Sequence, residues 1–507
     1  MRRPLFAAAA LALALAVAGP LAWPDAQARA ETRSVTRAQA DAEWAQASAL
    51  SDAGLVESAS AALGPIAENP AHPHFLDALA RLANIARAAP EGADIESWFD
   101  HVPPDAVGSL TRSDAGGVGY LLGKSLYRAG SYDAAISALV HVDPSDPLAP
   151  RALLWMSAAY VRQRSATPAV AALQRALATL DAALPSYDRA YLRDLALASL
   201  ARIYFSSAIQ LDEGTDAPTV DATRLSAAVK YWERLDTGSA LWPDASFELA
   251  TAYFLAGDRA RAEGLARFAG VVAGGGRHAV SLRVLRVASA FKDCAFDDAH
   301  AQLLGVRAIA GPLEAHLGAA IARAAASGRD DAFFALLVAV RDGRAAIEPD
   351  AGLVVQRALV DRSIARRMAY LGRIDAEGAA LARSSFAAWP VGQAARVALD
   401  RARARVASEI GRQARDLLTA EHDELTDALA AAAGLDDDLN QVARGGVHGL
   451  SDLLAAALVR GGTFRARDAS PAFYPPFLFP FDRRLPDNVR RYGTLLFYSV
   501  RGTTCGP

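Results

Sequence analysis

The chain has 507 residues, of which 52% are hydrophobic and 21% are charged, and its formal net charge is -3. This balance is typical of a helical globular protein and argues against a nucleic-acid-binding protein, which usually carries a clear basic excess. The length suits about three separate domains, or one extended solenoid whose repeats touch only their neighbours.

Residues 1–30 have the pattern of a secretory signal peptide. Arg2 and Arg3 precede an apolar run, and small residues follow it. We expect cleavage after Ala28 or Ala30 and therefore an exported, periplasmic protein, with attachment to the outer membrane left open. The alternative is an uncleaved membrane anchor, but the run is shorter than the ~20 apolar residues that a spanning helix needs.

Residues 31–110 contain short helical patterns separated by helix breakers. One pattern, from Leu55 to Ala67, ends before Asn69-Pro70, and another begins at Phe75 and ends before Pro90. We therefore expect an N-terminal helical segment ahead of the repeats.

Residues 111–310 repeat a helix-turn-helix pattern. In its clearest copy, Leu126 is followed by Gly130, Ala135 and Leu139 at offsets of 4, 9 and 13. Tyr160 lies 34 residues after Leu126, which is the period of a tetratricopeptide repeat. The predicted anchors of the first helices are Leu126, Tyr160, Tyr204, Tyr253 and Ala290. Five units predict a stable stack, since roughly three or more are needed.

Particular residues explain how one unit forms. Gly123 and Ala135 are small enough to let the two helices approach closely, and Gly130 ends the first helix at the turn between them. The third unit is longer than the others. Its extra residues, 211–225, are rich in Gly, Pro, Asp and Thr and predict a loop.

After a helical connector at residues 311–350, residues 351–440 predict a long helical hairpin. Its arms are Leu353 to Ser384 and Val391 to Gly434, and the second contains no proline. Arginines come first in the second arm and acidic residues follow. This pattern indicates either a docking rod for a charged partner or a solvated face paired with the neighbouring helix.

The last segment, residues 441–507, has a different character. It contains AFYPPFLFPFDRRLP at 472–486, where four prolines among five aromatic residues exclude a helix and predict an extended segment. This segment either packs along the rest of the chain or contacts a second protein. Cys505 is one of only two cysteines, and export permits a disulfide with Cys294, although a buried unpaired Cys294 is the alternative.

Motifs for chemistry are incomplete. The run GGVGYLLGKS has Val118 where a phosphate-binding loop requires glycine, and Lys124 and Ser125 fall inside a predicted helix. The acidic run that begins at Asp436 lacks the glycine and glutamate of a calcium loop. We therefore expect no cofactor, no metal site, no catalytic residue and no enzyme activity.

Three stretches, residues 241–264, 291–303 and 479–505, resemble a known group of proteins. LWPDASFELATAYFLAGDRARAEG at 241–264 and FKDCAFDDAHAQL at 291–303 are similar to exported tetratricopeptide proteins of myxobacteria and related bacteria, some of which are linked to adventurous gliding motility. The residues that carry the resemblance are Trp242, Glu248, Gly257, Asp258, Cys294, Phe296, Ala299, Pro480, Phe481, Asp482, Tyr492 and Cys505. The chain departs from the group at 483–486, where Arg-Arg-Leu-Pro replaces the expected Gly-Glu-Tyr-Trp.

These observations predict an all-α protein, in which a tetratricopeptide-like solenoid is followed by a long helical hairpin and an extended C-terminal segment. The leading hypothesis is a periplasmic scaffold that binds protein partners of the cell envelope. Its candidate binding residues are Lys124, Tyr127, Arg162 and Arg202. One alternative is a structural subunit that assembles through its hairpin and C-terminus; another is an envelope enzyme without a recognisable motif.

Overall fold

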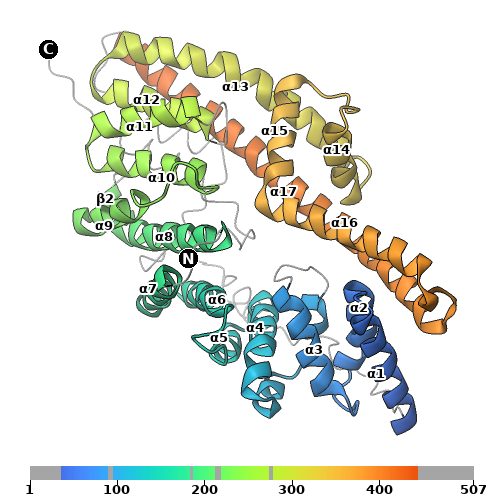
Figure 1. Ribbon diagram of the computed structural model, residues 1–507. Helices are drawn as coiled ribbons and strands as arrows, with labels where there is room; N and C mark the ends of the chain where they lie inside the picture. The colour runs from blue at the N-terminus through green and yellow to red at the C-terminus, as the bar shows by residue number, and fades with distance from the viewer. Residues whose placement is uncertain (1–35, 89–94, 183–186, 212–217, 273–277, 444–507) are drawn as a thin grey trace, which may run out of the picture.

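The computed structural model describes residues 36–88, 95–182, 187–211, 218–272 and 278–443. Helices dominate these residues and form a curved stack that a final long helix crosses (Figure 1). The predicted signal peptide, the extended segment at 472–486 and Cys505 lie outside the described residues. No helix within the described ranges combines the length and the apolar character that crossing a membrane requires.

Five helical hairpins occupy the region of the predicted repeats. They are α4 (Arg112–Arg128) with α5 (Tyr132–Leu139), α6 (Ala149–Arg162) with α7 (Ala166–Ala182), α8 (Tyr187–Ala208) with α9 (Ala222–Trp232), α10 (Trp242–Leu255) with α11 (Arg259–Val272), and α12 (Ala279–Lys292) with α13 (Phe296–Ala325). Each pair contacts the next, so the helical-repeat solenoid predicted from the sequence is confirmed.

The turn inside four of these five hairpins has a recurring geometry. Four residues after the anchor of the first helix, the backbone is left-handed at Gly130, Arg164, Gly257 and Cys294, with φ between 58 and 82°. The next amide then donates to the carbonyl of the anchor, as from Ser131 to Leu126 at 2.9 Å. This bond closes the helix end in the manner of a Schellman motif. The predicted offset of four residues from the anchor to the turn therefore coincides with the left-handed residue of the backbone.

Close packing in the first of these units depends on the predicted small residues. A Cβ atom at Gly123 would lie 2.5 Å from Cγ of Leu139, and Ala135 is fully buried. The helices α4 and α5 are therefore in contact at a distance that only glycine permits at position 123.

The insertion in the third unit contains two short strands where a loop was predicted. Strands β1 (Ile209–Leu211) and β2 (Pro218–Val220) pair antiparallel, with Ile209 opposite Val220. Asp221 then caps α9 by accepting from the amides of Thr223 and Arg224 at 2.9 and 3.1 Å. The insertion is thus a short hairpin that leads directly into a capped helix.

An additional unit precedes the predicted stack. Helices α1 (Arg37–Asp52) and α2 (Val56–Ala67) place Leu50, Gly54, Ala59 and Leu63 at the same offsets as Leu126 and its followers. Gly54 is left-handed at φ 76°, and the amide of Leu55 donates to the carbonyl of Leu50 at 3.0 Å. Helix α3 (Phe75–Ala88) and the short 3-10 helices η1 (Ile95–Phe99) and η2 (Pro104–Ser109) connect this unit to α4.

The C-terminal layer consists of α14 (Asp331–Arg341), α15 (Pro349–Val360), α16 (Arg362–Arg383), the 3-10 helix η3 (Ser385–Ala388) and α17 (Pro390–Ala443). The first arm of the predicted hairpin is interrupted, because Asp361 ends α15 and caps α16 through the amides of Ser363 and Ile364. The second arm is longer than predicted, with 54 residues in one helix of ~80 Å at ~1.5 Å per residue.

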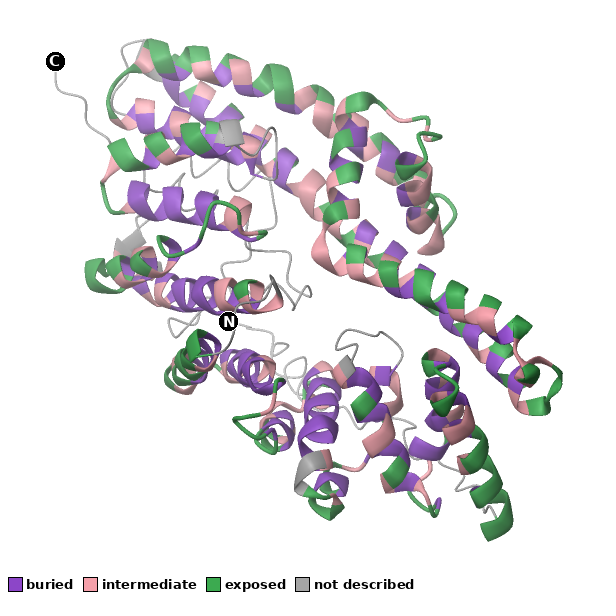
Figure 2. Ribbon diagram, in the orientation of Figure 1, coloured by how far each residue is buried: buried purple, intermediate pink, exposed green. Residues whose placement is uncertain are grey.

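Helix α17 brings the two ends of the stack together. Near its beginning it packs on α16 and α2, in its middle on α14, and farther on against α12 and α13 (Figure 1). Of its regularly spaced apolar residues, Leu399, Val406, Ile410 and Leu425 are buried, and Leu417 and Leu429 are half-buried. The buried residues run along both the stack and this layer, while exposed residues lie on their outer surfaces (Figure 2).

Candidate functional site

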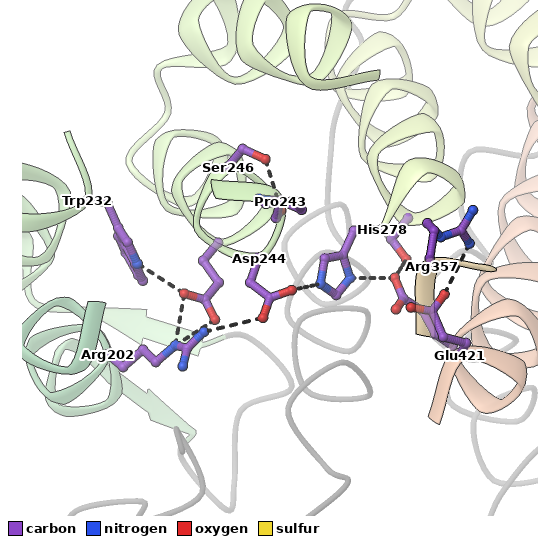
Figure 3. A network of polar contacts seen from close by, with 11 residues as sticks. Arg202, Trp232, Pro243, Asp244, Ser246, His278, Arg357 and Glu421 are labelled. Carbon is purple, nitrogen blue, oxygen red and sulfur yellow. Dashed lines mark hydrogen bonds and ion pairs between the residues drawn. The ribbon is translucent and has the colours of Figure 1, made fainter. Parts of the chain in front are cut away.

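The most unusual chemistry in the described residues is a buried polar network where the repeats meet α17, which we call the His278 joint (Figure 3). It contains Arg202, Trp232, Asp244, Glu248, His278, Ser281 and Glu424. These residues come from α8, α9, α10, the start of α12 and α17. Segments far apart in the sequence therefore share one network.

The first half of the joint lies within the stack. Glu248 accepts from Nε of Arg202 at 2.8 and 3.0 Å and from Nε1 of Trp232 at 3.0 Å. Arg202 and Glu248 are only 4% and 3% exposed. Burial raises the pKa of Glu248 despite the neighbouring Arg202 guanidinium. A paired and fully hydrogen-bonded arrangement is what allows charges to remain in such a site.

The second half connects the stack to α17 through His278. Its Nε2 lies 2.9 Å from Oδ1 of Asp244, and its Nδ1 lies 2.6 Å from Oε1 of Glu424. The ring also stacks on Phe247 with 4.8 Å between centroids. Ser281 donates to the same Glu424 oxygen at 2.7 Å. One imidazole thus joins α10 to α17.

The charge of His278 follows from these neighbours. Burial alone would lower its pKa, but the carboxylates of Glu424 and Asp244 together raise the pKa to about 10. The imidazole is then protonated at neutral pH, and both of its nitrogens face carboxylates. The backbone of His278 is also left-handed, with φ 66° and ψ 5°, which costs about 1–2 kcal/mol for a residue other than glycine.

This arrangement does not activate a nucleophile. A protonated imidazole is not a general base, and Ser281 donates to Glu424 rather than to His278. His278 and Glu424 are 6% and 5% exposed, so a substrate does not reach them. The geometry instead indicates a structural connection between the repeats and α17. No group of three or more His, Cys, Asp or Glu side chains within the described ranges has the arrangement of a metal site.

A second polar contact, the Asp188 joint, connects the middle of the stack to α16. Asp188 accepts from Arg151 at 2.5 Å, from Arg362 at 2.7 Å and from Arg366 at 3.0 Å. The guanidinium of Arg362 also lies 3.8 Å from the centroid of the Tyr191 ring. Two units of the stack are therefore attached to the start of α16.

A third contact, the Glu377 joint, connects the first unit to α16. The carboxylate of Glu377 accepts from the backbone amides of Glu57 and Ser58 at 2.8 and 2.5 Å, at the N-terminus of α2. Tyr370 donates to Glu57 at 2.9 Å. Burial and the nearby Glu377 carboxylate raise the pKa of Glu57. A negative charge at a helix N-terminus satisfies amides that the helix leaves unpaired.

Three of the four predicted binding residues lie inside the protein. Lys124 pairs with Glu96 and lies over the rings of Tyr120 and Trp155. Tyr127 is buried against Tyr132 and Trp155, and Arg202 belongs to the His278 joint.

Arg162 is half-buried, and its Nε donates to Tyr132 at 3.1 Å. The structure thus brings Lys124, Tyr127 and Arg162 to one aromatic cluster and separates Arg202 from them. Their binding of a partner stays a prediction, since burial leaves three of these side chains little free surface.

Sequence reasoning did not identify Asp244, His278, Glu377 and Glu424 as a set. His278 lies two residues after a run of three glycines, in a stretch with no complete site motif. The one available signal was Asp244 and Glu248 one helical turn apart in an otherwise apolar helix, which predicts a buried acidic face. His278, however, lies 34 positions from Asp244 and 146 positions from Glu424, separations that no local pattern encodes.

Comparisons with known proteins found similarities among solved structures only. No protein-family model matches this chain, and no curated protein matches it. Among solved structures it is similar to a tetratricopeptide repeat protein from Parabacteroides merdae, with 14% identity over 53% of this chain and 92% of that one, at a TM-score of 0.29. It is also similar to a Rap protein complexed with competence and sporulation factor, with 12% identity over 74% of this chain and 99% of that one, at a TM-score of 0.25.

Proposed function

We propose that this protein is a scaffold that binds protein partners in the periplasm. The observation that carries the proposal is the path of α17, which contacts the first helix pair of the stack and the last one. Repeat stacks otherwise hold each unit only through its neighbours and bend easily along their length. A helix that packs on both ends fixes the distance between them, which is the mechanical requirement of a scaffold.

The three joints support this proposal because each ties a different part of the stack to the C-terminal layer. The Glu377 joint holds α2, the Asp188 joint holds α6 and α8, and the His278 joint holds α10 and α12. Their charged groups face one another rather than a substrate. These residues thus hold the C-terminal layer on the repeat stack.

The periplasmic location rests on the signal-like pattern of residues 1–30. A role in gliding motility rests only on the resemblance of residues 241–264, 291–303 and 479–505 to the myxobacterial group. We propose the periplasmic location because of the signal-like pattern. Motility is one envelope process in which such a scaffold would take part.

The experiment compares two glycine variants in capture from cross-linked cell envelope. A Cβ at Gly411 of α17 would lie 1.9 Å from the carbonyl oxygen of Asp330, whereas a Cβ at Gly372 of α16 meets nothing within 4 Å. Gly411→Ala therefore displaces α17 from α14, and Gly372→Ala is the matched control.

We expect the unchanged protein and Gly372→Ala to recover the same discrete set of envelope proteins, and Gly411→Ala to lose most of it. Circular dichroism of each variant establishes that the repeats remain helical. Equal recovery from all three, or a monomer without partners in each case, would refute the scaffold function.

A further inference from the structure

The turn between α16 and α17 carries an apolar tip that is separate from the three joints. Trp389 is 54% exposed there, and Val397 in the second turn of α17 is 49% exposed. Pro390, Ala394 and Val397 follow one another at spacings of four and three residues, so they lie on one exposed face of α17. Figure 1 shows this turn at the outer end of the hairpin, beyond α2.

The tip is held in a rigid conformation. Ser384 caps η3 by accepting from the amide of Phe386 at 3.2 Å, and Trp389 lies edge-on to Phe386 with 5.4 Å between ring centroids. A Cβ at Gly392 would lie 1.8 Å from the carbonyl oxygen of Phe386, so the backbone approaches as closely as glycine allows. The exposed indole is therefore displayed by a preorganised turn.

The charges around the tip are predominantly positive. Residues 382–401 contain the exposed side chains of Arg383, Arg396 and Arg401 and only one acidic residue, Asp400. None of these three arginines has an ion-pair partner among the residues that the structure describes. Closer to the body of the protein, Arg403 pairs with Asp375 at 2.7 Å. Uncompensated positive charge is thus concentrated at the end of the hairpin.

We propose that the tip of the α16–α17 hairpin binds the surface of an anionic phospholipid bilayer. A projecting apolar end enters the headgroup region, where tryptophan is favoured, and the surrounding arginines bind lipid phosphates. The combination of one apolar anchor and a basic rim is the pair of signals that stable peripheral attachment requires. A protein partner would need a recess that matches this convex end, whereas a bilayer adapts to it.

The test measures co-sedimentation of the protein, produced without residues 1–30, with vesicles. One set consists of phosphatidylcholine alone, and in the other phosphatidylglycerol replaces one third of it. The variants are Trp389→Ser, and Arg396→Gln combined with Arg401→Gln. The matched controls are Phe268→Ser on α11, where the side chain is 48% exposed, and the exposed arginine pair Arg175→Gln with Arg323→Gln.

We expect binding to the anionic vesicles and much weaker binding to phosphatidylcholine. Trp389→Ser should weaken anionic binding about tenfold or more because about half of an indole leaves the apolar phase. Each arginine should contribute about fivefold at low salt. The controls should bind as the unchanged protein does, and thermal unfolding should be the same for all variants because the altered side chains are exposed.

Failure of the unchanged protein to sediment with anionic vesicles would overturn the proposal. It would equally be overturned if the tip variants sediment as well as the controls, or if a photo-cross-linker at position 389 captures a protein while no vesicle binds. Each outcome is independent of the capture experiment on Gly411 and Gly372, because the substitutions at the tip leave the packing of α17 on the stack unchanged.

Discussion

The repeat stack and the C-terminal layer are both helical, but they are held together differently. In the stack, neighbouring helices pack through small and apolar residues, as Gly123 of α4 does on Leu139 of α5. The layer shares a continuous apolar core with the stack, and it is also attached through charged groups, as where the Glu377 carboxylate accepts from the amide of Glu57. Local apolar packing makes the solenoid, while long-range apolar packing together with polar contacts closes it.

This difference predicts that single polar substitutions loosen the layer without melting the stack. Removing one partner of a buried pair leaves an uncompensated charge, which costs more than the pair itself contributed. Truncating an apolar side chain in the stack instead lowers the free energy of unfolding in proportion to the apolar volume that is removed. The following substitutions separate the two regions.

The largest effect is expected for His278→Gln. The glutamine carries no charge, so the buried Glu424 and the half-buried Asp244 lose their shared cation, and the free energy of unfolding should fall by about 3–5 kcal/mol. The matched control is His316→Gln, because His316 pairs with Asp350 at 3.0 Å while both side chains are 40% exposed. The control should lose less than about 1 kcal/mol. Equal losses in urea denaturation would show that the His278 joint does not hold the layer.

Gly411→Ala should be the next most severe change. Its Cβ would meet the backbone of Asp330 rather than a side chain that can move, so overpacking should cost about 1–3 kcal/mol. Gly372→Ala has open space around it and should be neutral or slightly stabilising in the helix. Hydrogen exchange should show faster exchange in α14 and α17 of Gly411→Ala, with α4 to α7 unchanged. Uniform loss of protection would contradict the separation of the two regions.

The pH dependence tests the same joint without substitution. The folded pKa of His278 is about 10, above its unfolded value of 6.5, so its stabilising contribution is complete below 6.5 and is lost as the pH rises toward 10. Between about pH 7 and about pH 9 the free energy of unfolding should fall by about 2 kcal/mol from this group. The His278→Gln variant should lack this part of the slope. Parallel pH profiles for both proteins would show that the imidazole is not held protonated.

The smallest effect is expected at the first unit. Glu377→Gln keeps an oxygen that accepts from the amide of Glu57 or Ser58 but removes the charge, which should cost about 1 kcal/mol. The same substitution removes the like charge beside Glu57 and should lower the raised pKa of that carboxyl. The control is Arg37→Gln, whose ion pair with Asp41 is exposed and should contribute less than about 0.5 kcal/mol. An unchanged Glu57 titration in carbon-detected NMR would contradict the contact.

Much of the stack was predictable because its contacts lie close in sequence. The offsets from Leu126 to Gly130, Ala135 and Leu139 recur in space as one turn geometry, and the same offsets from Leu50 describe the first unit as well. That unit was not predicted because two 3-10 helices and α3 separate it from α4, so it falls outside the 34-residue period. The length of α17 was also indicated, since no proline interrupts it.

Helix periodicity, small residues at fixed offsets and breaker residues are local properties, and the sequence alone determined from them that this protein is a solenoid followed by long helices. The position of α17 across the stack depends on contacts such as those between Gly411 and Asp330 and between His278 and Glu424. These pairs have no periodic signature, because burial and charge neutralisation select them only after the helices are packed. Tertiary structure therefore decided that Lys124, Tyr127 and Arg202 are buried and that Trp389 is displayed.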